Sequence, residues 1–218
     1  MCYNRKHYEK YNKTFFFLFL TLFFTSCIDY VQTVSYKDGE YKLYYKVTLS
    51  KMLFEMADEE PEEVFDVFND DTLKDLPENI KIQRVNTDLE VGGEFFVNIN
   101  PKTTDETEKA LLPTVAGKKC FIPFLIGNES NSLIEYFKED DSESQEITKA
   151  VLSSAKCKIL IDKSVLPIID SAYFEGRGGQ NYSIALFDYG VSYCLEIPFI
   201  ILFETGMYNF DRIVVIRG

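Results

Sequence analysis

Histidine and tryptophan are almost missing from this sequence of 218 residues, which contains one histidine, His7, and no tryptophan. Residues 27–218 therefore contain no histidine at all. Nucleophilic sites of the Ser-His-Asp and Cys-His types require an imidazole, and so do metal sites that are built on histidine ligands. These classes of site are excluded from the part of the chain after residue 26.

A long hydrophobic run is also missing. The apolar stretch Phe15–Phe24, interrupted by Thr21, would reach only about 15 Å as a helix, half of a hydrocarbon core of about 30 Å. A basic segment precedes this stretch and small polar residues follow it, an order that is typical of a secretory signal peptide. The basic residues are Arg5, Lys6, Lys10 and Lys13. We predict that residues 1–26 are a signal peptide and that residues 27–218 form the mature domain.

The residues at the predicted cleavage point, Phe24-Thr25-Ser26-Cys27, resemble the lipobox of bacterial lipoproteins. The resemblance implies that the chain is cut before Cys27 and that acyl chains are attached to this cysteine. Phe24 stands where the motif usually has leucine, and Thr25-Ser26 replace its commoner small residues. Two alternatives therefore stay open: an ordinary signal peptide removed without lipidation, and a short buried helix.

Positive charge is scarce after residue 26. The whole chain has 23 Lys and Arg against 35 Asp and Glu. Four of these cations and one acid, Glu9, lie in residues 1–26, so residues 27–218 have a formal net charge of 19 − 34 = −15. Phosphate backbones and anionic lipid headgroups repel such a surface. We therefore expect no nucleic-acid partner, and we expect membrane contact to depend on lipid at Cys27.

Beyond Cys27, cysteine is limited to three thiols in the mature domain, Cys120, Cys157 and Cys194. Each begins a short apolar run that predicts a strand. An exported protein can form disulfides, but three thiols cannot all pair with one another. We favour burial of all three in strands as small hydrophobic side chains. The alternatives are one disulfide with a free thiol, and a three-thiolate zinc site, which lacks the usual close Cys-x-x-Cys pair.

Asp38-Gly39 predicts a β-hairpin with a two-residue turn of type I′. Counting outward from this turn pairs side chains that share one face of the hairpin. The predicted pairs are Tyr36 with Tyr41, Val34 with Leu43, Gln32 with Tyr45, and Tyr30 with Val47. The turn and the strand pattern agree, so the mature domain is expected to open with this hairpin.

The remaining pattern alternates between helices and strands. We expect helices at 50–57, with a core stripe of Met52, Leu53 and Met56, from Pro61, from the capping box Thr103-x-x-Glu106 to Pro113, and from Ser132 and Ser142. We expect strands at 80–91 and 94–100 around Gly92-Gly93, and further strands at 119–126, 156–162, 171–175, 181–187, 192–203 and 209–216. Such interleaving with short turns predicts an α+β fold, a mostly antiparallel sheet with several short helices packed on it.

Several motifs resemble parts of known sites, and each has a simpler structural explanation. Gly176-Arg177-Gly178-Gly179 lacks the ending of a phosphate loop and is typical of a strand connection. Ser153-x-x-Lys156 matches the ends of the Ser-x-x-Lys motif of penicillin-recognising enzymes, whose other motifs are absent here. The acidic runs 58–63 and 139–143 lack the residue order of a calcium loop. We therefore predict no catalytic residue, no cofactor and no metal site.

The segments Cys27–Gln32, Tyr41–Lys51 and Asp211–Gly218 resemble lipoproteins of spirochaetes such as treponemes, a group with no assigned activity. The resemblance implies export and lipidation, and it transfers no functional residue except Cys27. We expect a lipid-anchored protein of the bacterial cell envelope, on its periplasmic or surface face. Its expected role is a non-enzymatic binding or interaction module for an envelope protein or a small molecule. The alternative is a histidine-free envelope hydrolase that uses a carboxylate pair.

Overall fold

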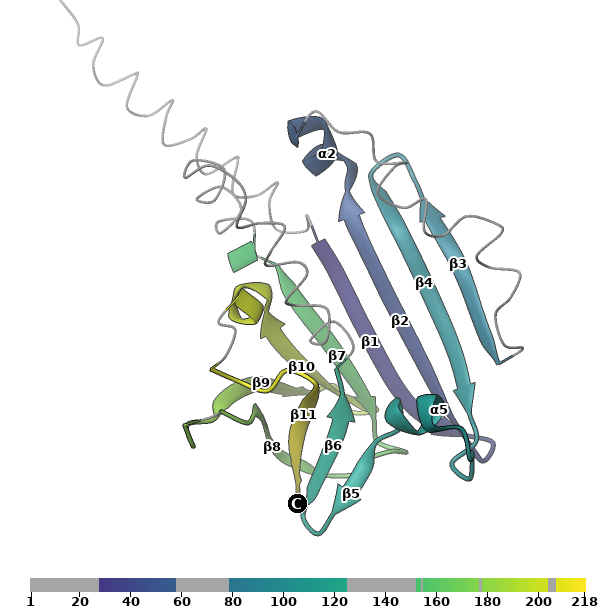
Figure 1. The fold of residues 1–218 in the computed structure, drawn as a ribbon, viewed down its shortest axis with the longest axis vertical. Coiled ribbons are helices and arrows are strands. Elements are labelled where there is room, and N and C mark those ends of the chain that lie inside the picture. Colours follow the sequence, from purple (N-terminus) through teal and green to yellow (C-terminus); the bar gives the residue numbers. More distant parts are fainter. Residues whose placement is uncertain (1–27, 58–78, 125–151, 154, 177, 204–206) are drawn as a thin grey trace, which may run out of the picture.

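The computed structural model describes residues 28–57, 79–124, 152–153, 155–176, 178–203 and 207–218. Its strands form one sheet in the order β3-β4-β2-β1-β7-β10-β9-β8-β11-β6-β5 (Figure 1). Neighbouring strands are antiparallel except β1 and β7, which run parallel. The strands are β1 (Ile28–Lys37), β2 (Glu40–Ser50), β3 (Ile80–Asn86), β4 (Glu90–Ile99), β5 (Thr114–Ala116), β6 (Lys119–Pro123), β7 (Lys156–Asp162), β8 (Ile169–Phe174), β9 (Tyr182–Asp188), β10 (Ser192–Pro198) and β11 (Arg212–Arg217).

The predicted α+β class is wrong, because the described part of the chain is nearly all β. Its helical elements are two short helices, α2 (Lys51–Ala57) and α5 (Glu106–Ala110), and the 3-10 turn η3 (Phe199–Phe203). Helix α5 buries none of its residues. Signals for a helix start mark where a turn of helix can begin, but they fix neither its length nor its packing on the sheet. The helices predicted from Pro61, Ser132 and Ser142 lie outside the described residues.

The predicted opening hairpin is confirmed, with the predicted pairs at their predicted places in the β1–β2 register. Asp38 and Gly39 both have positive φ, 59° and 86°, as a type I′ turn requires. Helix α2 follows at the predicted place. Its Phe54, which was not part of the predicted stripe, is buried and packs against Val91 and Leu49.

The predicted turn at Gly92-Gly93 is wrong, because both glycines lie inside β4. A Cβ atom on Gly92 would lie 2.0 Å from the carbonyl oxygen of Val47 on β2. The glycine is therefore needed for close approach of two strands rather than for a turn. The chain turns earlier, where the Thr87 hydroxyl accepts hydrogen bonds from the N–H groups of Leu89 and Glu90 at 3.2 and 3.1 Å.

Other predicted elements shift by a few residues. The cap of α5 is Asp105 rather than Thr103, and its carboxylate accepts hydrogen bonds from the N–H groups of Thr107 and Glu108. The last predicted strands are present as β7 to β11, except that β10 ends at Pro198 and η3 takes its place from Phe199. Strand β5 was not expected, and its three residues are all exposed.

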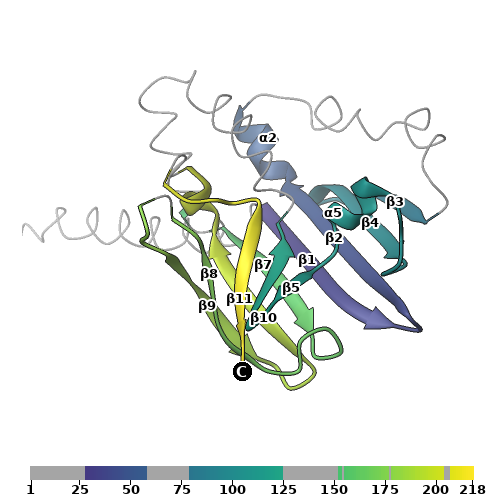
Figure 2. The same cartoon turned by 60° about the horizontal axis from the view of Figure 1, so that its bottom comes forward.

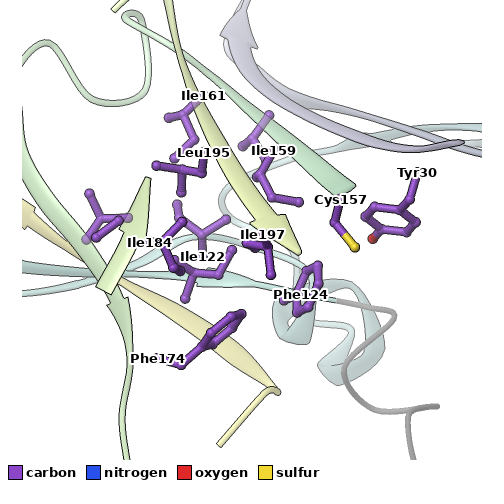
Figure 3. Packing of buried hydrophobic residues seen from close by; sticks show 14 of the residues in the cluster. Tyr30, Ile122, Phe124, Cys157, Ile159, Ile161, Phe174, Ile184, Leu195 and Ile197 are labelled. Atoms are coloured by element: carbon purple, nitrogen blue, oxygen red, sulfur yellow. The ribbon is translucent and has the colours of Figure 1, made fainter. Parts of the chain in front are cut away.

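The sheet turns back on itself and encloses the main core (Figures 1 and 2). Strands β1 and β6 lie far apart in the strand order, but the Gln32 amide on β1 donates a 2.7 Å hydrogen bond to the Pro123 carbonyl at the end of β6. The rings of Tyr30 and Phe124 also meet edge to face at 5.9 Å. Figure 3 shows apolar side chains of the core that the sheet encloses. They include Ile122, Ile159, Ile161, Phe174, Leu195 and Ile197.

Candidate functional site

The predicted lipid-attachment residue, Cys27, lies outside the described residues. The next residue in the sequence, Ile28, is the first residue of β1. Strand β1 is paired on both sides, with β2 and β7. Cys27 therefore directly precedes, in the sequence, a strand that has a neighbour on each side.

The strand directions give the folded sheet two distinct ends. Strands β1, β4, β7, β9 and β11 begin at the end that contains Ile28, and their antiparallel neighbours finish there. We call this the anchor end. The opposite end, which we call the distal end, carries the β1–β2 turn, the connection 163–168 between β7 and β8, the turn 189–191 between β9 and β10, and Gly218 (lower part of Figure 1).

Exposed hydrophobic side chains are concentrated at the distal end. Among the described residues, five of the large exposed ones lie in or beside its turns: Tyr36, Ile168, Phe187, Tyr189 and Val191. We call these five the distal rim. Tyr189 and Val191 are the most exposed of them, at 62% and 74%. Turn tips in soluble proteins usually carry polar residues, so apolar side chains there are characteristic of an interaction surface.

Short hydrogen bonds hold three connections of the distal end in fixed positions. The N–H of Lys163 donates to the carbonyl of Val191 at 3.1 Å, which joins the 163–168 connection to the turn between β9 and β10. The N–H of Tyr36 donates to the Ser164 hydroxyl at 3.0 Å, which joins the same connection to the first hairpin. The rim is therefore preorganised, and binding through it would lose little conformational entropy.

The positive charge of Lys163, at the distal end, is already balanced by a neighbouring carboxylate. The Lys163 ammonium group lies 2.9 Å from the Asp188 carboxylate and 4.8 Å from the centre of the Tyr193 ring. This hydrogen bond holds the pKa of Asp188 below its ordinary value, and the N–H of Gly190 lowers that pKa further. The same contact raises the pKa of Lys163. The Lys163–Asp188 pair therefore offers neither a free acid nor a free base beside the distal rim.

No protein-family model, curated protein or solved structure matches this chain. The candidate site therefore depends on the geometry of the described residues.

Among the described residues, the carboxyl groups with a shifted pKa are Asp105 and Asp188. Both pKa values are lowered by hydrogen bonds, and both side chains are exposed. A general acid for glycoside hydrolysis requires a raised pKa. Within the described ranges, no group of His, Cys, Asp and Glu side chains is arranged to hold a metal ion. In the same ranges, no helix is long and apolar enough to cross a membrane.

Some residues of the motifs that resembled known sites lie in the described part of the chain, and these residues have structural roles. Lys156 forms an ion pair with Glu196 on the adjacent strand, with 2.6 Å between nitrogen and oxygen. Gly176 and Gly179 close the connection between β8 and β9 through a backbone hydrogen bond of 3.1 Å, and a strand follows rather than a helix. Neither arrangement forms a nucleophile or a phosphate loop.

The favoured interpretation of the three thiols is confirmed. Cys120, Cys157 and Cys194 are all buried and none forms a disulfide. Burial raises the pKa of Cys120 to about 11, and it raises the pKa of Cys157 well above its ordinary value. These thiols act as small hydrophobic side chains.

Sequence reasoning did not identify the distal rim. The signal that was present is Tyr189-Gly190-Val191, an apolar pair around a glycine between two predicted strands. The sequence does not show that this turn lies beside the 163–168 connection and the first hairpin, because their segments are far apart along the chain.

Proposed function

We propose that this chain is a lipid-anchored lipoprotein of the bacterial cell envelope, and that it acts as a non-enzymatic binding module for a protein partner. The observation that carries the proposal is the separation of two features at opposite ends of one sheet. Cys27 immediately precedes the anchor end, and the distal rim lies at the other end. A lipid on Cys27 would turn the rim away from the membrane and toward other proteins.

The composition of the distal rim favours a protein as the ligand. Tyrosine and other aromatic side chains are enriched at the centres of protein interfaces, where they bury large areas. Two charges beside the rim, Lys163 and Asp188, are paired with each other, so an apolar patch on a partner would leave neither of these two charges uncompensated. The lipobox resemblance at Cys27 and the resemblance to spirochaetal lipoproteins support the envelope location. No described pair of carboxylates favours the alternative, a histidine-free hydrolase.

Site-specific photo-crosslinking in the bacterium that makes the protein tests this proposal. A photoreactive amino acid replaces Tyr189, Val191 or, as the control, Phe96, which is also exposed, at 39%, but lies within β4. We expect the two rim positions to capture the same partner and the control position to capture none.

The captured protein is then purified and its affinity for the full mature chain is measured. The double variant Tyr189→Ser, Val191→Lys should bind about tenfold more weakly or worse, since central apolar contacts contribute most of the binding energy. Phe96→Ser should bind like the wild type. Equal crosslinking at Phe96, or unchanged affinity in the double variant, would show that the distal rim is not the binding surface.

A further inference from the structure

Strand β3 is one end of the described sheet, and its neighbour in the strand order is β4 (Figure 1). The strand at the other end, β5, has only three residues, whereas β3 has seven. A strand at the end of a sheet presents N–H and carbonyl groups along its outer side, and a row of such groups can pair with a strand of another chain. Of the two ends, only β3 is long enough to hold an added strand.

Two hydrogen bonds beside β3 indicate which of its backbone groups point outward. The N–H of Asn98 donates to the Asn79 carbonyl at 3.1 Å, and the N–H of Thr87 donates to the Glu90 carbonyl at 2.9 Å. Asn79 and Thr87 thus turn their backbone groups toward β4, and in an antiparallel pair this direction alternates from one residue to the next. Over the continuous register of β3 and β4, the residues that direct their N–H and carbonyl groups away from β4 are therefore Ile80, Ile82, Arg84 and Asn86.

The charged side chains of β3 are all positive. The strand contains Lys81 and Arg84, both exposed, and no acidic residue. Neither cation forms an ion pair with a carboxylate of the described residues. The exposed Asp88 lies in the turn beyond the end of the strand. Like charges on facing strands destabilise a pair, so a second copy of β3 fits this edge poorly, whereas a strand that carries carboxylates fits it well.

The two cations lie on opposite faces of the sheet, because they are three residues apart in a strand whose side chains alternate. In the register with β4, Lys81 pairs with Phe96 and Arg84 with Gly93. A strand added on the outer side can place one carboxylate opposite each cation only if these carboxylates are also three residues apart. The charges of β3 therefore specify both the sign and the spacing of the charges on a partner.

We propose that the outer edge of β3 binds an extended acidic segment of a partner protein, which adds to the sheet as a further strand. Two carboxylates of that segment, three residues apart, lie opposite Lys81 and Arg84. Main-chain hydrogen bonds supply affinity in this mode of binding, and side chains supply specificity. The surface is separate from the distal rim and does not depend on lipid at Cys27. Strand β4 is two strand spacings, about 10 Å, from the added strand, so Phe96 remains a control for the rim.

Two synthetic peptides test the proposal against the full mature chain in an NMR titration. The probe is Thr-Val-Glu-Thr-Val-Glu-Thr, whose glutamates are three residues apart. The control, Thr-Val-Glu-Thr-Glu-Val-Thr, has the same composition, but its glutamates are two residues apart and share one face. We expect the probe to bind about fivefold more tightly than the control, and to slow hydrogen exchange at the N–H groups of Ile82 and Arg84.

Equal affinity for the two peptides would overturn the proposal. Slow exchange at Ile82 and Arg84 in the free chain would also overturn it, because the edge would then already be paired with another segment of the chain or with a second copy.

Variants of the chain separate the charges of β3 from its backbone. Lys81→Glu combined with Arg84→Glu should weaken binding of the probe about tenfold. The matched control, Lys37→Glu combined with Lys118→Glu, changes two exposed lysines outside β3 and should leave binding unchanged. Unchanged binding in the β3 variant, or equal loss in the control, would contradict the proposed contact.

Arg84→Ala and Arg84→Pro remove the same charge, but proline also removes an N–H that faces the outer side. Since β4 does not use this N–H, the edge of the sheet should tolerate the proline, and the melting temperatures of the two variants check this. We expect Arg84→Pro to weaken binding of the probe more than Arg84→Ala does. Equal binding by the two variants would show that the peptide does not pair with the backbone of β3, and would overturn the proposal.

Discussion

Among the buried polar side chains of β1 and β2, Tyr30, Gln32 and Tyr45 differ in their hydrogen bonding. Gln32 is fully buried, donates to the Pro123 carbonyl at 2.7 Å and accepts from the Tyr30 hydroxyl at 3.1 Å. Tyr45 is also buried, but its hydroxyl has no hydrogen-bond partner in the part of the chain that the structure describes. Burial raises the pKa of Tyr45 far above its ordinary value. One hydroxyl thus stabilises the fold, whereas the other carries a desolvation cost.

Replacing these two tyrosines by phenylalanine should therefore have opposite effects. Tyr30→Phe leaves the Gln32 carbonyl oxygen without its donor, and we expect it to lower the free energy of unfolding by about 1–3 kcal/mol. Tyr45→Phe removes an uncompensated polar atom, and we expect stability to be unchanged or higher by about 1 kcal/mol. Urea denaturation of both variants measures the difference. A Tyr45→Phe variant as unstable as Tyr30→Phe would mean that the Tyr45 hydroxyl is hydrogen-bonded in solution.

At the scale of the element, Gly92 on β4 allows β2 and β4 to pack closely. Gly92 pairs with Thr48 in the register, and the Thr48 side chain is buried although it is polar. The Thr48 hydroxyl is satisfied by the Glu90 carboxylate. A side chain at position 92 would push the two strands apart and would disturb this pair as well.

Gly92→Ala should lower the free energy of unfolding by about 1–3 kcal/mol, the usual cost of overpacking. The matched control is Gly178→Ala in the connection between β8 and β9, where an added Cβ meets no atom within 4 Å and φ is not positive. The melting temperatures of the two variants provide the comparison. Equal melting temperatures for both would show that β2 and β4 can separate at little cost.

At the scale of the whole molecule, β1 and the exposed rim belong to one coiled sheet. The hydrogen bond from Gln32 to Pro123 and the contact between Tyr30 and Phe124 join β1 to β6 across the core, so the strand after Cys27 is part of the rigid body. The proposed lipid would therefore set the orientation of the entire domain.

Cys27→Ala should leave an uncleaved precursor or a soluble exported protein, because the proposed membrane attachment depends on this one residue. Each buried methylene contributes about 0.8 kcal/mol, so one acyl chain holds weakly and two or three hold firmly. The acidic mature chain gives no electrostatic help. Detergent phase partition checks the outcome, with wild-type protein in the detergent phase and Cys27→Ala in the aqueous phase. Mass spectrometry that finds the wild-type mature N-terminus unmodified would favour plain secretion instead.

Local patterns of sequence determined the elements whose causes are local. Asp38-Gly39 predicted the first hairpin with its register, because turn type and side-chain period act over a few residues. Short apolar runs predicted β7 and the burial of the three thiols for the same reason. The lack of histidine after residue 26 excluded imidazole chemistry without any structure.

Tertiary structure alone decided the features that depend on distant neighbours. Gly92 resembles a turn residue in sequence, and only the strand that packs beside it shows that it serves close approach. The α+β prediction failed because signals for a helix start show neither how long the helix is nor whether it packs on the sheet. The distal rim arises from the pairing of segments far apart in the chain. Pairing over such distances is fixed by the packing of the common core rather than by any local pattern.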